Sequence, residues 1–152
     1  MIGKMPSMRP NYQPILDTRQ NQLGFVLSAA DSIDGKALGI LGANIAVLIF
    51  IAQSGLQLDL TEWAALFAPF VASLIFNIMA TWPQPYRGNV SVEDRPEYLS
   101  MDEEDLLLQL LADTEGAIKE NAGLNSMRMG WYTISIALSM IGAGLLTYFL
   151  LQ

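Results

Sequence analysis

Residues 131–151 read WYTISIALSMIGAGLLTYFLL, a run of 21 residues without Lys, Arg, Asp, Glu or His. A helix needs about 20 mostly apolar residues to cross a hydrocarbon core of ~30 Å. Two further stretches, residues 37–53 and 63–81, are similarly apolar and lack the same residue types. The sequence therefore predicts an all-α protein with three membrane-spanning helices.

The basic residues indicate how the chain is threaded. All eight Lys and Arg residues precede the first span or lie between the second and third spans. The predicted outer loop, residues 54–62, has none, and neither does the end of the chain. Lys and Arg are enriched in cytoplasmic loops. We therefore expect a multi-pass membrane protein with its N terminus in the cytoplasm and its C terminus outside.

Composition excludes several classes of function. The chain has no Cys and no His, which rules out disulfides, thiol catalysis, haem ligation and sites built on histidine. Its net charge is −7, and all acids except Asp59 and Glu62 lie in the predicted cytoplasmic parts, which argues against a nucleic-acid-binding face. We expect a lipid bilayer as partner, no enzymatic activity, no catalytic residues, no metal and no tightly bound cofactor.

Long helical extensions are predicted on the cytoplasmic side of the first and third spans. Residues 1–14 contain three prolines and should form a flexible tail, whereas apolar residues recur at helical spacing through residues 15–36 and no proline precedes the end of the first span. A break near Gly35 is the alternative. Residues 82–100, with three prolines, predict an irregular connection. An amphipathic helix follows over residues 101–130, opened by a Ser100–Glu103 capping box, and continues into the third span.

Small and polar residues occur inside the spans at helical spacing. Gly35, Gly39, Gly42 and Ala46 fall within about 60° of arc on an ideal helix, and Ser135, Ser139, Gly142 and Ala143 supply a comparable face in the third span. Asn44 points away from the glycine face. Two opposed faces that both need protein partners indicate a homo-oligomer, or else packing of each face against one of the other two spans.

The second span carries a polar row at intervals of four residues, formed by Ser73 and Asn77 between Pro69 and Thr81. This row should face protein or water. With Asn44, Ser135 and Ser139 it either lines a pore or makes hydrogen bonds between helices, and the second interpretation explains the same residues without a channel.

Charged residues gather at the cytoplasmic mouth of the first span, where Asp31, Asp34 and Lys36 lie close in sequence. They are either hydrated anchoring residues or an electrostatic latch toward the cytoplasmic domain. Arginines and tyrosines elsewhere on the cytoplasmic side are either anchors or a site for an anionic ligand. These residues are Tyr86, Arg87, Arg95, Tyr98 and Arg128.

The stretch ADSIDGKALGILGAN, residues 30–44, carries an Asp34-x-Lys36-Ala37 element. It resembles the entry to the first span in Pycsar transmembrane effectors, which share the order of span, short outer loop, span, charged cytoplasmic helix and last span. The resemblance implies a bacterial antiphage effector in the inner membrane that perturbs the membrane when activated. It also implies an activating cyclic pyrimidine nucleotide, cyclic CMP or cyclic UMP, made by a partner cyclase. Asp31, Asp34, Lys36 and the cytoplasmic arginines and tyrosines are then the candidate ligand-binding residues.

Two other classes of function fit the same features. A structural or accessory subunit of a larger membrane complex would use the small faces for docking and needs no ligand. A constitutive small oligomeric channel would conduct without a signal.

Overall fold

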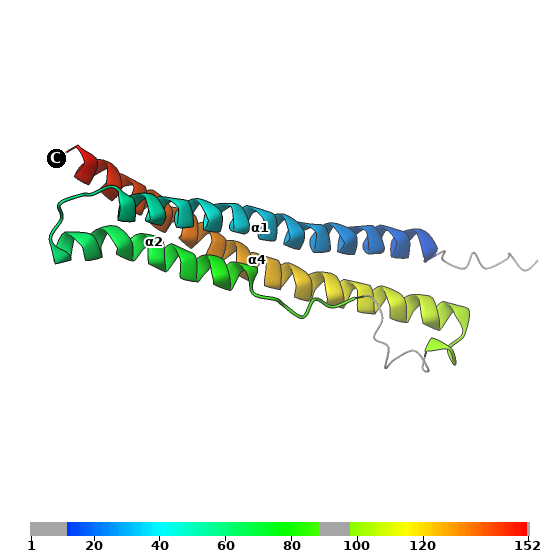
Figure 1. Ribbon diagram of the computed structural model, residues 1–152. Helices are drawn as coiled ribbons and strands as arrows, with labels where there is room; N and C mark the ends of the chain where they lie inside the picture. The colour runs from blue at the N-terminus through cyan, green and yellow to red at the C-terminus, as the bar shows by residue number, and fades with distance from the viewer. Residues whose placement is uncertain (1–11, 89–97, 152) are drawn as a thin grey trace, which may run out of the picture. The chain divides into compact units, whose positions relative to one another are not determined.

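The computed structural model describes residues 12–88 and 98–151. These residues form three long helices, α1 (Gln13–Gln53), α2 (Leu60–Thr81) and α4 (Glu103–Leu150), and contain no strand (Figure 1). Each of the three helices is long and apolar enough to cross a membrane. The prediction of an all-α, three-span helical protein is therefore confirmed, and the three candidate spans support a multi-pass membrane protein.

The first helix runs without interruption from Gln13 to Gln53, so the alternative of a break near Gly35 is wrong. The predicted cytoplasmic helix and first span, residues 15–36 and 37–53, are parts of this one helix. No proline follows Pro14 within α1, so every later residue can keep its backbone N–H bonded.

The second helix begins at Leu60, three residues before the predicted start of the span. Asp59 is its N-cap: its carboxylate accepts the Glu62 N–H at 2.8 Å, and the Glu62 carboxylate accepts the Asp59 N–H at 2.9 Å. This reciprocal pair satisfies two backbone donors at the helix start. The predicted outer loop of residues 54–62 is correspondingly shorter, because its two acids belong to the cap.

The last helix begins at Glu103, and its cap differs from the predicted Ser100–Glu103 box. Asp102 accepts the Asp105 N–H at 3.0 Å, so the capping side chain lies two residues further along. An Asp caps as well as a Ser, and the acids that follow it complement the helix dipole. The helix then continues through the predicted boundary at residues 130 and 131 to Leu150.

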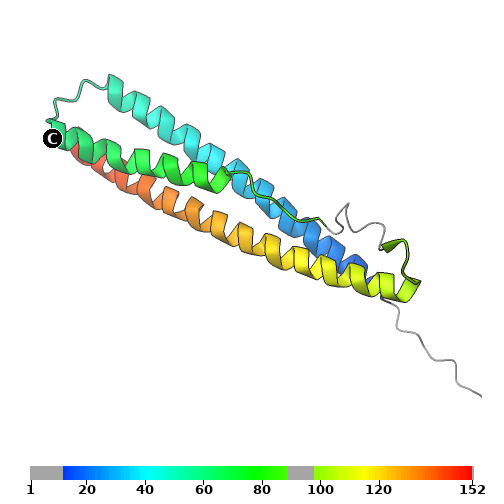
Figure 2. The same cartoon turned by 90° about the horizontal axis from the view of Figure 1, so that it is seen from below.

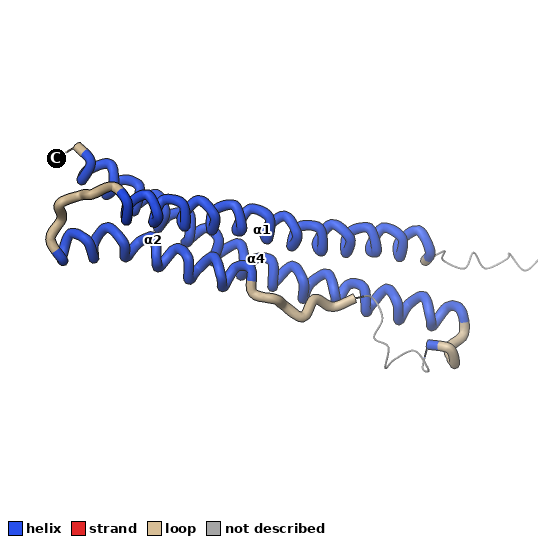
Figure 3. The backbone as a smooth tube through the Cα atoms, viewed as in Figure 1, coloured by secondary structure: helices blue, strands red, loops and turns tan. Residues whose placement is uncertain are grey.

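The connections are irregular where they are described (Figure 3). Residues 82–88 leave α2 without helical structure, as predicted, and residues 99–102 turn into α4. Arg95 and the predicted tail, apart from residues 12–14, lie outside the described residues.

The chain forms two compact units, the first made of Met1–Val26 and Tyr86–Asn121, the second of Leu27–Pro85 and Ala122–Gln152. In the first unit, the beginnings of α1 and α4 lie side by side and run in the same direction (Figures 1 and 2). Leu16 and Leu23 of α1 and Ala117 of α4 are buried there. Arg19 and Glu115 form an ion pair across the two helices at 3.1 Å.

The second unit contains three packed helical segments, from α1, α2 and α4. Ile51, Leu66 and Phe70 form a buried apolar cluster near the connection between α1 and α2. Phe70 packs directly on Gly142: a Cβ at residue 142 would lie 2.7 Å from two ring carbons. Val71, Ile75 and Ile78 are exposed on the outside of α2, as expected for side chains that face lipid.

Candidate functional site

A polar cluster joins the three helices of the second unit. Asn44 Nδ2 of α1 donates to Ser73 Oγ of α2 at 2.7 Å, and Ser139 Oγ of α4 donates to Asn44 Oδ1 at 3.0 Å. The Ser73 hydroxyl lies 2.8 Å from that of Ser135 and 2.9 Å from that of Ser139. Asn44, Ser73 and Ser135 are at most 3% exposed. These four side chains therefore bond to one another between helices, and the polar row of α2 faces protein.

Ser73 is the centre of this cluster, and more polar groups surround its hydroxyl than the hydroxyl can bond to. Its hydroxyl also lies 2.9 Å from the Ser135 carbonyl oxygen, so four polar groups surround one oxygen atom. A serine hydroxyl has one donor and two acceptor lone pairs. It satisfies three of the four neighbours at any moment.

Asn77 has the opposite environment. Its side chain is 1% exposed, and its amide nitrogen and oxygen have no hydrogen-bond partner among the residues that the structure describes. A buried amide without a partner destabilises a fold by about 1–3 kcal/mol. The residue therefore lowers the stability of this arrangement.

A buried charge lies at the other end of the same unit. Arg128 of α4 is 2% exposed, donates from Nε to the Ala80 carbonyl oxygen at 2.6 Å and forms an ion pair with Asp34. Ala80 lies in the last turn of α2, where carbonyl groups lack helical partners and a cation is favourable. The Arg128 side chain thus ties together α1, α2 and α4.

Of the three charged residues at the start of the first span, Asp31, Asp34 and Lys36, Asp34 forms the ion pair with Arg128. Asp34 is half-buried against Arg128, whereas Asp31 and Lys36 are exposed. Arg128 itself is buried, which differs from the hydrated anchor considered on sequence grounds. Its sequence signal was weak, because Arg128 precedes the third span and is indistinguishable there from an interfacial arginine.

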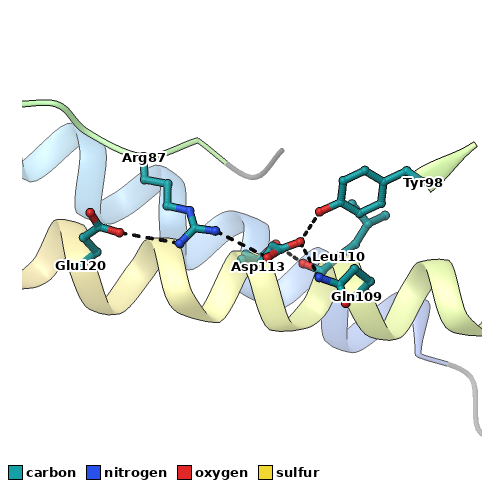
Figure 4. Close-up of polar contacts among 7 residues, drawn as sticks. Arg87, Tyr98, Gln109, Leu110, Asp113 and Glu120 are labelled. Atoms are coloured by element: carbon teal, nitrogen blue, oxygen red, sulfur yellow. Dashed lines mark hydrogen bonds and ion pairs between the residues drawn. The ribbon is translucent and has the colours of Figure 1, made fainter. Parts of the chain in front are cut away.

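A second group of charged side chains lies in the first unit (Figure 4). Arg87 is 3.5 Å from Asp113 and 3.7 Å from Glu120, and Tyr98 donates its hydroxyl to Asp113. Asn121 accepts the Arg87 N–H at 2.9 Å and donates to the Arg87 carbonyl oxygen at 2.8 Å. The structure thus brings Arg87 and Tyr98 together around a carboxylate.

The remaining candidates for an anionic site have different locations. Tyr86 is half-buried in the same unit, Arg128 belongs to the other unit, and Arg95 lies outside the described residues. An anion that binds Arg87 would have to compete with Asp113 and Glu120 for the guanidinium group.

The predicted small faces have different environments. Gly35, Gly39, Gly42 and Ala46 are all exposed, and a Cβ added to any of the three glycines would meet nothing within 4 Å. In the third span, Ser135 and Gly142 are buried and Ser139 is half-buried, whereas Ala143 is exposed. The glycine face of α1 is therefore not covered by any of the residues that the structure describes, while most of the α4 face is buried or half-buried.

The chain matches none of the family models, curated proteins or solved structures with which it was compared.

Proposed function

We propose that this chain is a bacterial inner-membrane effector of a cyclic-pyrimidine-nucleotide antiphage system, which perturbs the membrane when activated. The resemblance of the Asp34-x-Lys36-Ala37 element supplies the class. The observation that carries the proposal is the contact of that same Asp34 with the buried Arg128. A membrane effector needs an inactive arrangement that a signal can release, and this ion pair joins α1 to α4.

The Asp34–Arg128 ion pair can stabilise an inactive packing of α1 and α4 relative to an activated one. Loss of Asp34 from this pair should destabilise the arrangement by about 1–3 kcal/mol, less than for a fully buried pair, because Arg128 is buried but Asp34 is half-exposed. A movement that separates α1 from α4 at this level therefore removes the Asp34 carboxylate from Arg128 and leaves its contact with the Ala80 carbonyl oxygen. A signal has to supply only the difference in free energy between the two arrangements.

The expected signal is cyclic CMP or cyclic UMP from a partner cyclase. Its phosphate would compete with Asp113 and Glu120 for Arg87, and α4 contains both these acids and Arg128 within one unbroken helix. Lys36, Asp31 and Tyr86 remain accessory candidates. The absence of Lys and Arg from the outer loop supports a cytoplasmic N terminus, where such a nucleotide is available.

The test is dye leakage from liposomes that contain the purified protein, with and without cyclic CMP or cyclic UMP. Asp34→Asn should change the leakage, either by opening the protein without nucleotide or by blocking the response. Asp31→Asn is the matched control, since it makes the same change on the same helix at an exposed position. Absence of nucleotide-dependent leakage from well-folded protein, or equal behaviour of the two variants, would count against the proposal.

A second candidate, an accessory subunit or homo-oligomer held by helix docking, is favoured by the exposed glycine face of α1. Glycines without a covering side chain allow two helices to approach closely. Gly39→Leu would then lower the mass of the assembly that the protein forms in detergent, or abolish co-purification with a larger complex, without changing the fold of one chain. Leakage that requires no nucleotide would instead favour a constitutive channel.

A further inference from the structure

Two polar residues of α2 have mismatched surroundings although they lie one turn apart on one face. Ser73 has four polar neighbours and bonds to at most three of them. Asn77 offers two donor hydrogens and two acceptor lone pairs and has no partner among the described residues. Ser73 therefore has fewer hydrogen-bonding groups than its neighbours could engage, and Asn77 has unused ones.

The inward face of α2 repeats every four residues. Its polar positions are Ser73, Asn77 and Thr81, and its apolar positions are Leu66, Phe70 and Leu74, all buried or half-buried. Four residues of an α-helix rise about 6 Å and rotate about 40° beyond a full turn. A shift of this size toward the Leu60 end therefore moves Asn77 to the place of Ser73, Thr81 to that of Asn77 and Leu74 to that of Phe70, while Ser73 moves to the buried place of Pro69.

We infer that α2 has a second packing register, shifted four residues toward its Leu60 end, in which Asn77 replaces Ser73 among Asn44, Ser135 and Ser139. The direction follows from the sequence of the face. A shift the other way would bring Pro69 into the cluster, and its side chain has no polar group. One-turn shifts of one packed helix past another are an established form of conformational change.

Contacts near the C-terminal end of α2 hold the observed register. The Ala80 carbonyl oxygen accepts from Arg128, and the Phe76 ring stacks on Trp131 with centroids 5.6 Å apart. Both contacts are lost when α2 moves by about 6 Å. Arg128 therefore opposes the shift and Asn77 favours it. This inference concerns the packing of α2 and does not depend on the proposed function.

The absence of cysteine from the chain permits a direct measurement of the register. Spin labels at Ala65→Cys and Met129→Cys would lie on exposed positions of α2 and α4. Ala65 lies near the Leu60 end of α2, whereas Met129 follows Arg128, which contacts the last turn of α2. The second-unit part of α4 runs antiparallel to α2 (Figure 2). Movement of α2 in the inferred direction lengthens the distance between the labels by up to ~6 Å. Pulsed electron paramagnetic resonance of the labelled protein in liposomes would resolve the two distances.

Two substitutions bias the registers in opposite directions. Ser73→Ala removes the hydroxyl that stabilises the observed register. The population with the long distance, relative to that with the short distance, should therefore rise about tenfold, the equivalent of one hydrogen bond of ~1.4 kcal/mol. Asn77→Leu removes the group that serves the second register, so the long distance should disappear. The double variant should resemble Asn77→Leu.

A distance distribution in Ser73→Ala that equals that of the parent would overturn the inference. So would a long distance that persists in the double variant, because the shift would then not depend on Asn77. Arg128→Lys is the second test, since it keeps Ser73 and Asn77 and weakens the contact with Ala80. If Ser73→Ala does not fold, an unchanged distribution in Arg128→Lys is sufficient to reject a second register.

Discussion

Gly142→Ala should destabilise the second unit because of one close contact. The added Cβ would lie 2.7 Å from two carbons of the Phe70 ring and 3.0 Å from a third. Phe70 is 1% exposed and packs with Ile51 and Leu66, so the ring has little room to withdraw. Overpacking of this kind typically costs ~1–3 kcal/mol. Thermal unfolding of the protein in detergent should show a midpoint lower by several degrees.

Gly144→Ala is the matched control, since it makes the same change two residues later on the same helix. A Cβ there would meet nothing within 4 Å, and alanine is the better helix former, so its midpoint should stay the same or rise. Phe70→Leu should relieve the clash, so the loss caused by Gly142→Ala should shrink in that background. Equal midpoints for the two glycine variants, or an undiminished loss beside Phe70→Leu, would refute the packing argument.

Three further predictions follow from single contacts. Asp34→Asn should lower the free energy of unfolding in detergent by about 1–3 kcal/mol, less than for a fully buried pair because Asp34 is half-exposed. The control Asp31→Asn should leave this free energy unchanged, and equal losses in the two variants would argue against the ion pair. Asp59→Ala should lower the same free energy by ~1 kcal/mol through loss of the α2 cap, and an unchanged value would show that the cap is not needed in the membrane. A cysteine at exposed Gln57 should react with an impermeant maleimide in intact cells, whereas one at exposed Lys119 should react only after permeabilisation; the reverse pattern would invert the threading.

Helical spacing in the sequence predicts both the glycine face of α1 and the polar row of α2, but it does not predict which side chains contact them. Glycine spacing on α1 and serine spacing on α4 look equivalent in the sequence, yet a Cβ would contact Phe70 only at Gly142. Which small face packs within the chain depends on how α2 is placed between its neighbours. No local pattern in α1 or α4 encodes that placement.

The cap at Asp59 and Glu62 was missed although its signal was present. An Asp three residues before a Glu at the start of an apolar run is a capping pattern, whereas the hydrophobic run alone predicts a start at Trp63. The cap at Asp102 was misplaced by two residues within an acidic run where several positions compete. Both errors concern helix ends, where the hydrophobic period carries no information.

The sequence by itself determined the number of spans, their approximate limits and the continuity of the long helices. These follow from local properties: the length of apolar runs, the absence of interior prolines other than Pro69, and the periodicity of one helix face. Only the tertiary structure decided that Arg128 is buried against Asp34, that Ser73 collects four polar neighbours and that Asn77 has none among the described residues. Each of these facts depends on contacts between residues 29 to 94 positions apart, or on their absence, and so on the relative rotation and height of packed helices.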